Sequence, residues 1–316
     1  MLLPKYLQFN YTINSTTAQI LIFRYLATGN SFVDLHHSYR LGVTTIKEIV
    51  SRVCSALWNI LQKECLPEPT KEDWLRTAAE FEKRANFPNC LGAVDGKHIR
   101  IVKPPNSASL YYNYKNYFSI ILMAVTDANY QFVYVDIGSY GKCGDSTIFQ
   151  QSTLYQRINT GTMDIPEDRP ISQTRTTPIP FVFLADDAFS QSQRIMCPFI
   201  GKQLNMKKRL FNYRHCRGRR YVECTFGILA NKWRIFHRAL NVNIELAIDI
   251  IKACCVLHNY VRSRDGFQFA DTLYRFPSDG NIRGGTHTRQ YNSNARNILA
   301  EYFANEGAVS WQNHYL

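Results

Sequence analysis

The sequence predicts an α/β fold preceded by an all-helical module. Apolar residues recur at helical spacing through residues 16–88, whereas short apolar runs rich in β-branched residues begin after Phe87 and are later joined by helical stretches. A hydrophobic content of 45% in 316 residues allows one or two domains with large cores. We expect a helical module over residues 1–88, an α/β or α+β domain over 89–262 and an irregular tail over 263–316.

The helical module is predicted to contain a helix-turn-helix. A first helix runs from residue 16 to Gly29, and Ser31 begins a short second helix with Asp34 three residues later, the spacing of a capping box. After a turn containing Gly42, Thr44 or Thr45 caps a longer helix whose apolar stripe runs through Ile46, Ile49, Val50, Val53, Leu57 and Ile60.

The first turn of that longer helix is a candidate for DNA contact. In helix-turn-helix proteins the start of the second helix of the motif enters a DNA groove, which here would present Thr44, Thr45 and Lys47. The alternative is a small helical bundle that makes no contact with DNA.

The remaining elements follow from apolar runs and helical periodicity. Another helix is predicted over Lys71 to Asn86, and later helices over Gly218 to Phe236, Ile244 to Arg262 and, in the tail, near Ala295 to Ala304. Strands are predicted at Cys90 to Val94, His98 to Val102, Phe118 to Val125, Gln131 to Ile137 and Phe181 to Ala185.

Positive charge is concentrated around one carboxylate. The window from Lys202 to Arg238 holds eleven Lys and Arg but a single acid, Glu223, and so supplies ten of the twelve net positive charges. Such a field favours a polyanionic partner, and a fixed carboxylate within it suits a metal ion that acts on phosphates. The alternative is a helix with a solvated basic face in which Glu223 forms an intrahelical ion pair.

Two aspartates directly follow apolar segments of the chain. Asp95 and Asp186 each follow an apolar run, where a buried charge is costly unless it is paired or functional. Together with Glu223 they could hold Mg²⁺, which prefers oxygen ligands, and two such ions could activate a nucleophile and stabilise the leaving oxygen. The alternative is that both aspartates cap turns. No cluster has zinc spacing and no phosphate-binding P-loop occurs.

The cysteines and the apolar runs indicate the compartment of the protein and whether it spans a membrane. Nine cysteines are scattered without a C-x-x-C pair, which favours reduced thiols in an intracellular protein. The N-terminus does not have the pattern of a signal peptide, and no apolar run approaches the roughly 18 residues of a membrane span.

Five segments, in order, resemble the motifs of PIF/Harbinger-type transposases and their domesticated nuclease relatives. They are residues 89–99 (NCLGAVDGKHI), 136–146 (DIGSYGKCGDS), 184–189 (LADDAF), 220–227 (RYVECTFG) and 254–259 (CCVLHN). The resemblance implies an RNase H-like mixed sheet flanked by helices. It also implies a metal-dependent DNA endonuclease whose Asp/Asp/Glu triad, here Asp95, Asp186 and Glu223, binds Mg²⁺ or Mn²⁺ in a two-metal site.

The third segment departs from the family pattern. Ala185 replaces a usual glycine, and Asp187-Ala188-Phe189 replaces Ser-Gly-Tyr, so Asp187 competes with Asp186 as the ligand. The alternation of side chains along a strand places the two aspartates on opposite faces, and the alignment with the family favours Asp186. An alternative function is a domesticated DNA-binding protein that retains the fold without cleavage.

Further residues and partners are expected around this site. Asp145 either caps a helix beginning near Ser146 or lies near the metal, and His258 and Asn259 either pack or face the site. Four arginines before Glu223 are candidates for phosphate contact, namely Arg214, Arg217, Arg219 and Arg220. The resemblance implies a nuclear protein, with or without a cytoplasmic pool, that acts on DNA with a separate Myb-like partner or as a homodimer.

Overall fold

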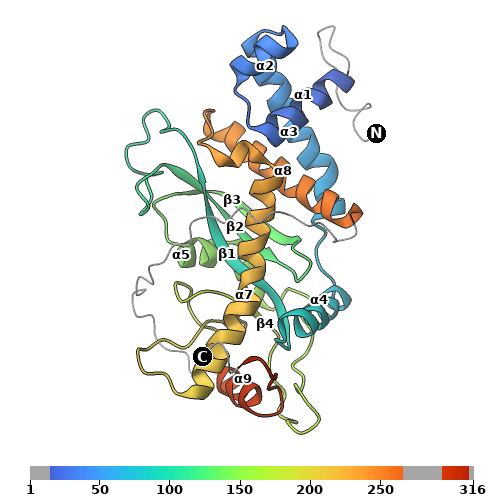
Figure 1. Ribbon diagram of the computed structural model, residues 1–316, viewed down its shortest axis with the longest axis vertical. Helices are drawn as coiled ribbons and strands as arrows, with labels where there is room; N and C mark the ends of the chain where they lie inside the picture. Colours follow the sequence, from blue (N-terminus) through green and yellow to red (C-terminus); the bar gives the residue numbers. More distant parts are fainter. Residues whose placement is uncertain (1–14, 266–293, 313–316) are drawn as a thin grey trace.

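Three helices gather at one end of the molecule. A computed structural model describes residues 15–265 and 294–312 of the chain (Figure 1). The first elements are α1 (Ser15–Thr28), α2 (Phe32–Tyr39) and α3 (Val43–Cys65), and α3 packs along α8 (Ile244–Arg264). The predicted apolar stripe of the long helix is confirmed for Ile46, Ile49, Val50, Val53 and Leu57, all of which are buried.

The two predicted helix starts have different outcomes. Ser31 caps α2, and Ser31 with Asp34 forms the expected capping box. The cap predicted at Thr44 or Thr45 is wrong, because the N-cap of α3 is Gly42 and no side chain caps this helix. Thr44 and Thr45 lie instead within the first helical turn, where Thr44 and Lys47 are exposed and Thr45 is half-buried.

The described residues form a mixed five-stranded sheet in the order β3-β2-β1-β4-β5. The strands are β1 (Cys90–Arg100), β2 (Ser119–Thr126), β3 (Phe132–Tyr140), β4 (Val182–Leu184) and β5 (Ile195–Met196). The first three pair antiparallel, whereas β4 pairs parallel with β1 and β5 parallel with β4. The two runs predicted on either side of Asp95 are one strand, because β1 pairs with β2 from Ala93 to Arg100 without interruption.

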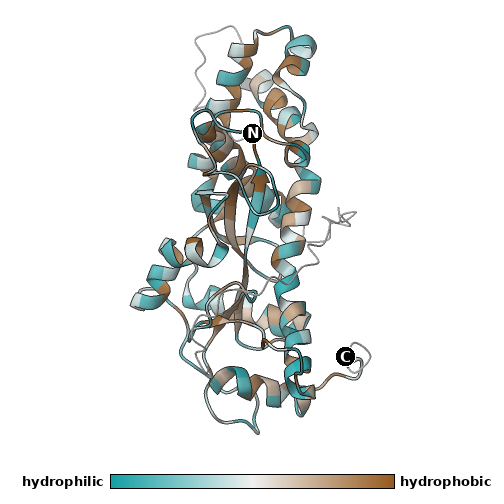
Figure 2. Cartoon of the chain, turned by 90° about the vertical axis from the view of Figure 1, so that its left-hand side faces the viewer, coloured by the Kyte–Doolittle hydropathy of each residue, from teal (hydrophilic) through white to brown (hydrophobic). Residues whose placement is uncertain are grey.

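Helices cover both faces of this sheet. Ala93, Ile99 and Leu184 pack in one buried cluster with residues of α3, α7 (Met206–Lys232) and α8. On the other face, Val94 and Phe183 pack with residues of α5 (Asp145–Gln151) and α6 (Thr153–Thr160). The hydropathy view agrees, since the central strands are largely apolar between more polar helices (Figure 2). This is the RNase H-like α/β arrangement, so the predicted fold class is confirmed.

Helix α7 is the longest helix of the described chain and runs along the sheet (Figure 1). It begins at Met206, twelve residues before the predicted start at Gly218, with Asn205 as its cap. The 3₁₀ helix η1 (Arg234–His237) and α8 follow it. Helix α4 (Lys71–Ala85) contacts both β1 and α7.

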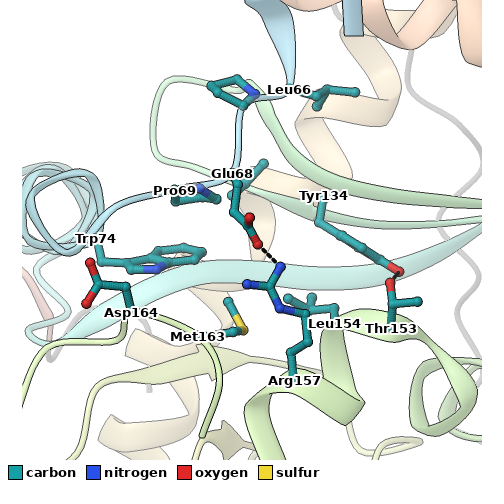
Figure 3. A pocket seen from close by; sticks show the side chains of 12 residues that line it. Leu66, Glu68, Pro69, Trp74, Tyr134, Thr153, Leu154, Arg157, Met163 and Asp164 are labelled. Atoms are coloured by element: carbon teal, nitrogen blue, oxygen red, sulfur yellow. Dashed lines mark hydrogen bonds and ion pairs between the residues drawn. The ribbon is translucent and has the colours of Figure 1, made fainter. Parts of the chain in front are cut away.

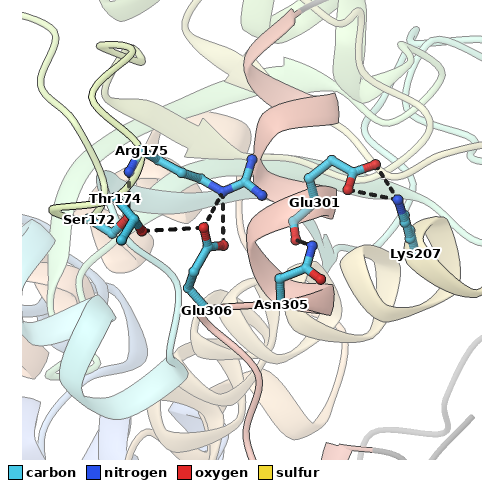
Figure 4. A network of polar contacts seen from close by, with 7 residues as sticks. All are labelled: Ser172, Thr174, Arg175, Lys207, Glu301, Asn305 and Glu306. Carbon is cyan, nitrogen blue, oxygen red and sulfur yellow. Dashed lines mark hydrogen bonds and ion pairs between the residues drawn. The ribbon is translucent and has the colours of Figure 1, made fainter.

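The helix expected near the C-terminus is present as α9 (Asn294–Ala304) and packs on α7. Lys207 Nζ on α7 lies 2.6 Å from Glu301 Oε1 on α9, and Arg175 Nε lies 2.9 Å from Glu306 Oε2 just beyond it (Figure 4). Phe303 of α9 is fully buried in the same cluster as Phe87 and Phe211. The division into three parts at residues 88 and 262 stays a prediction.

All nine cysteines are free thiols. Among the described residues, no helix is both long enough and apolar enough to cross a membrane.

Candidate active site

The parallel pairing of β1 with β4 brings the two predicted aspartates together. Ala93 pairs with Leu184, and two residues further along each segment lie Asp95 and Asp186. Because Ala93 and Leu184 pack on the α7 side, alternation along the backbone directs Asp95 and Asp186 to that same side. Asp187 follows one residue later, in the turn after β4.

Gly218 allows α7 to approach this edge of the sheet. A β-carbon at Gly218 would overlap Cδ1 of Leu184, the last residue of β4. The absence of a side chain therefore fixes the close contact between α7 and β4. Arg219 follows directly, and its side chain reaches Asp95. Glu223 lies one helical turn later on the same side of α7.

Arg219 joins two of the predicted triad residues. Its Nη1 lies 3.5 Å from Asp95 Oδ2, and its Nη2 donates a hydrogen bond to Glu223 Oε1. Burial acts to lower the pKa of Arg219, but the carboxylates of Asp95, Glu223 and Asp186 outweigh it and raise this pKa. The intrahelical pair considered for Glu223 is thus present, and it extends to Asp95 across to the sheet.

Asp145 is a further carboxylate at this site. It is the first residue of α5, but Gly144 is the N-cap and no side chain caps this helix. A β-carbon at Gly96 would overlap the carboxylate of Asp145, so this carboxylate lies directly against β1 at the residue after Asp95. Alternation along β1 places it on the α5 face of the sheet, opposite to the side chain of Asp95, and the two carboxylates act on each other through their charges. Its Oδ1 is buried and has no hydrogen-bond partner. The structure therefore favours the location near the other carboxylates over the predicted capping role.

Crowding of these acids changes their proton affinities. Burial, together with the charges of Asp95 and Asp186, raises the pKa of Asp145 to about 7. Burial and the charge of Asp95 raise the pKa of Asp186 to about 6. Burial also raises the pKa of Asp95, and Arg219 opposes that change. Perturbed carboxylates of this kind cluster at functional sites, because an added cation relieves both burial and repulsion.

Comparison with known proteins identifies the family. A family model described as DDE superfamily endonuclease matches residues 94–259, which is more than half of the chain. The chain belongs to the DDE superfamily endonuclease family. The matched range begins one residue before Asp95 and includes Asp145, Asp186 and Glu223.

Distant relatives of this DDE endonuclease domain occur in plants and vertebrates. The chain is 26% identical over 243 residues to "Protein ALP1-like" of Arabidopsis thaliana, covering 75% of this chain and 58% of the relative. It is 29% identical over 184 residues to "Putative nuclease HARBI1" of Homo sapiens, covering 57% of this chain and 48% of the relative. The chain thus spans about half to three fifths of their lengths, and the predicted family resemblance is confirmed. No solved structure matches the chain.

DDE endonucleases typically use a divalent cation, and carboxylate oxygens are the ligands that such a cation prefers. Several carboxylates converge, one buried oxygen lacks a partner, and oxygen ligands suit Mg²⁺ and Mn²⁺. Within the described ranges, no group of three His, Cys, Asp or Glu residues is arranged as a set of metal ligands. The guanidinium of Arg219 supplies the positive charge between Asp95 and Glu223 in this arrangement.

The arginines predicted to contact phosphate separate into different roles. Arg214 is fully buried, where its Nη2 donates to the carbonyl of Gly307 at 2.7 Å and its guanidinium lies between Phe303 and Trp311. Its burial removes Arg214 from the surface available to DNA. Arg219 faces the carboxylates, Arg217 is half-buried and Arg220 is exposed.

His258 and Asn259 are structural. His258 Nε2 donates to the carbonyl of Tyr130 at 2.7 Å, and Asn259 Nδ2 donates to the carbonyl of Phe132 at 2.7 Å. Both side chains are buried, so the packing alternative holds for each.

A cavity of about 180 Å³ lies apart from the carboxylates, between the segment that joins α3 to α4 and helix α6 (Figure 3). Glu68 forms an ion pair with Arg157 there, and Trp74 and Met163 contribute apolar surface. None of the candidate catalytic residues lines this cavity.

Two features of the site cannot be read from the local sequence, namely the contact of Gly218 and the reach of Arg219 to Asp95. The role of Gly218 depends on a contact with Leu184, 34 positions earlier, and no local pattern signals it. The pairing of Arg219 with Glu223 was foreseeable, because four residues separate them on one helix face. Its extension to Asp95 was not, since that contact depends on the packing of α7 on the sheet.

Proposed function

We propose that this protein is a divalent-metal-dependent DNA endonuclease that uses Asp95, Asp186 and Glu223, with Asp145 as a further carboxylate. The observation that carries the proposal is that Asp95, Asp186 and Glu223 all act on Arg219, which lies 3.5 Å from Asp95 and donates to Glu223. Membership of the DDE endonuclease family supports it, as does the relative that is named a nuclease.

The roles of the residues follow from their positions. Asp95 and Asp186 would hold Mg²⁺ or Mn²⁺, Glu223 would complete the ligand set from α7, and Asp145 would contribute a nearby negative charge. Bound cations would lower the pKa of a water nucleophile and neutralise charge on the scissile phosphate, leaving a 3′ hydroxyl. Burial of the aspartates excludes competing water and strengthens their interaction with a cation.

Contacts to DNA would come from two places. Arg220 lies exposed on α7 three residues from Glu223, where a guanidinium can bind a backbone phosphate. At the far end of the molecule, the first turn of α3, with Thr44 and Lys47 exposed and Thr45 half-buried, would contact a groove of the DNA. We further propose a nuclear location, with a Myb-like partner or a second copy assisting.

A plasmid-nicking assay tests the endonuclease. Wild-type protein is expected to nick supercoiled DNA with Mg²⁺ or Mn²⁺ and not with EDTA, and Asp95→Asn combined with Asp186→Asn is expected to abolish nicking. Asp187→Asn is the matched control and is expected to retain it. Nicking by the double variant at the wild-type rate would refute the assignment.

One observation favours the alternative of a DNA-binding protein without cleavage. Arg219 already pairs with Asp95 and Glu223, so part of the carboxylate charge is balanced without a metal ion. Binding of DNA that depends on salt, without nicking under any metal condition, would support this alternative.

A further inference from the structure

A second charged site lies on the opposite side of α7 from the carboxylates. A cavity of about 170 Å³ opens between α4, the turn joining β2 to β3, and α7. Its described lining contains three arginines and no carboxylate: Arg84, Ala85, Tyr130, Arg217, Arg220, Tyr221 and Cys224. This composition concentrates positive charge in a concave and partly enclosed space.

Helical geometry separates this cavity from the candidate active site. Arg217, Tyr221 and Cys224 recur at intervals of four and three residues, which places them on one stripe of α7. Arg219 and Glu223 lie about half a turn away, on the side that faces Asp95. Arg220 lies on the exposed side of the helix near the cavity rim.

Packing leaves one donor of this cavity, the Nε of Arg217, without a partner. Trp311 covers one face of the Arg217 guanidinium, 4.3 Å from its ring centre, and the buried Arg217 Nε has no hydrogen-bond partner. Tyr130 and Tyr221 stack on each other with ring centres 5.0 Å apart and form a rigid wall. Arg84 Nε is paired with Glu80 at 2.7 Å, and its guanidinium also reaches the carbonyl of Ala128.

We propose that this cavity binds a backbone phosphate of the DNA that the carboxylate site cleaves. Guanidinium groups hold phosphate oxygens through several directed hydrogen bonds, and an unpartnered buried donor is satisfied by such a ligand. Because both sites lie on α7, a phosphate held here fixes the position of the strand relative to Glu223. The identity of the ligand rests on the proposed function, whereas the phosphate chemistry of the cavity does not.

Cys224 provides a direct probe because its side chain lines the cavity. Burial raises the pKa of its thiol, so alkylation with N-ethylmaleimide is followed by mass spectrometry at alkaline pH. The protein is kept in EDTA, with a short duplex, with inorganic phosphate, or with potassium chloride at equal ionic strength. Cys65, at the end of α3 and outside the lining, is the internal reference.

The duplex and inorganic phosphate are each expected to slow alkylation of Cys224 by about tenfold, while Cys65 changes little. The double variant Arg217→Gln, Arg220→Gln is expected to lose this protection. It is also expected to reduce the slope of log affinity for DNA against log salt by about 1, the value of one phosphate contact. Arg76→Gln, which removes an exposed charge from α4 outside the cavity, is the matched control.

Three results would overturn the proposal. The first is protection by neither ligand. The second is protection by inorganic phosphate but not by DNA, and the third is protection by DNA that persists in the double variant. A melting curve for each variant establishes that it is folded. The EDTA keeps cleavage out of the protection experiment, so the two proposals can fail separately. Nicking without protection of Cys224 would rule out only phosphate binding in this cavity, and protection without nicking would rule out only the endonuclease.

Discussion

Replacement of Arg219 by Gln is expected to strengthen metal binding. Nη1 of Arg219 lies 3.5 Å from Asp95 Oδ2, and at an effective dielectric of about 20 such a pair attracts by about 4 to 5 kcal/mol before desolvation. The side chains of Arg219 and Asp95 are 21% and 19% exposed, so solvent screening is modest. After the cost of desolvation, we take about 1.5 to 3 kcal/mol as the net value that a cation must overcome. The substitution should therefore raise metal affinity by about ten- to a hundredfold.

The assay is a titration with Mn²⁺ in which electron paramagnetic resonance measures the free ion. It is run above pH 7, because the pKa of Asp145 is about 7 and a protonated carboxyl competes with the metal. Arg220→Gln is the matched control: it removes the same charge from an exposed neighbour on α7 and tests the effect of net charge alone. Adding Asp95→Asn to Arg219→Gln should cancel the gain.

A second readout is independent of any catalytic activity. Without metal, Arg219→Gln should be less stable than the wild type, because Asp95 and Asp186 lose their counter-charge. Saturating Mn²⁺ should restore that stability, since a ligand that binds only the folded state stabilises it. Equal or weaker Mn²⁺ binding by Arg219→Gln than by the wild type would show that the guanidinium does not compete with a cation.

Three further predictions concern stability. Gly218→Ala should lower the free energy of unfolding in urea by about 1 to 3 kcal/mol, because the added β-carbon overlaps Leu184. Gly144→Ala, which has open space around its β-carbon, should change this free energy little. Equal effects of the two substitutions would contradict the contact between Gly218 and Leu184. Burial lowers the pKa of His258 to about 4, below its value of about 6.5 in the unfolded chain. Below about pH 6.5 the unfolded chain therefore binds a proton at His258 and the folded chain does not, so stability falls as the pH drops toward 4. His258→Gln should reduce this fall by about 2 to 3 kcal/mol, whereas exposed His37→Gln should leave it unchanged. Trp311→Ala should cost about 1 to 2 kcal/mol by uncovering Arg214 and Arg217, and no change in thermal melting would argue against these contacts.

The sequence was sufficient for those elements whose signal is local. The apolar run ending at Ala185 and the stripe from Ile46 to Leu57 each indicated a buried segment, and both are buried as strand and helix. Strand β5 was missed because two residues give no periodicity. The start of α7 was placed too late, since residues 206–217 are basic and lack a continuous apolar stripe.

The site depends more strongly on contacts between distant segments. Asp95 and Asp186 were recognised because a charge beside a buried strand is unusual, and the pairing of β1 with β4 then places them together. Nothing in the local sequence distinguishes Arg214 from Arg220. One is buried only because α9 and Trp311 pack over it, and the other remains at the surface.

The attachment of α3 to α8 has a consequence for where DNA would be cut. Asn259 of α8 donates a hydrogen bond to the carbonyl of Cys65 at the end of α3 and another to that of Phe132 at the start of β3. The 23 residues of α3 extend about 35 Å from that anchor, with Thr44 and Lys47 at the distant end. With α3 anchored in this way, recognition of DNA by its first turn and cleavage at the carboxylates, as proposed, would make the number of base pairs between the recognised sequence and the broken bond the same at every target.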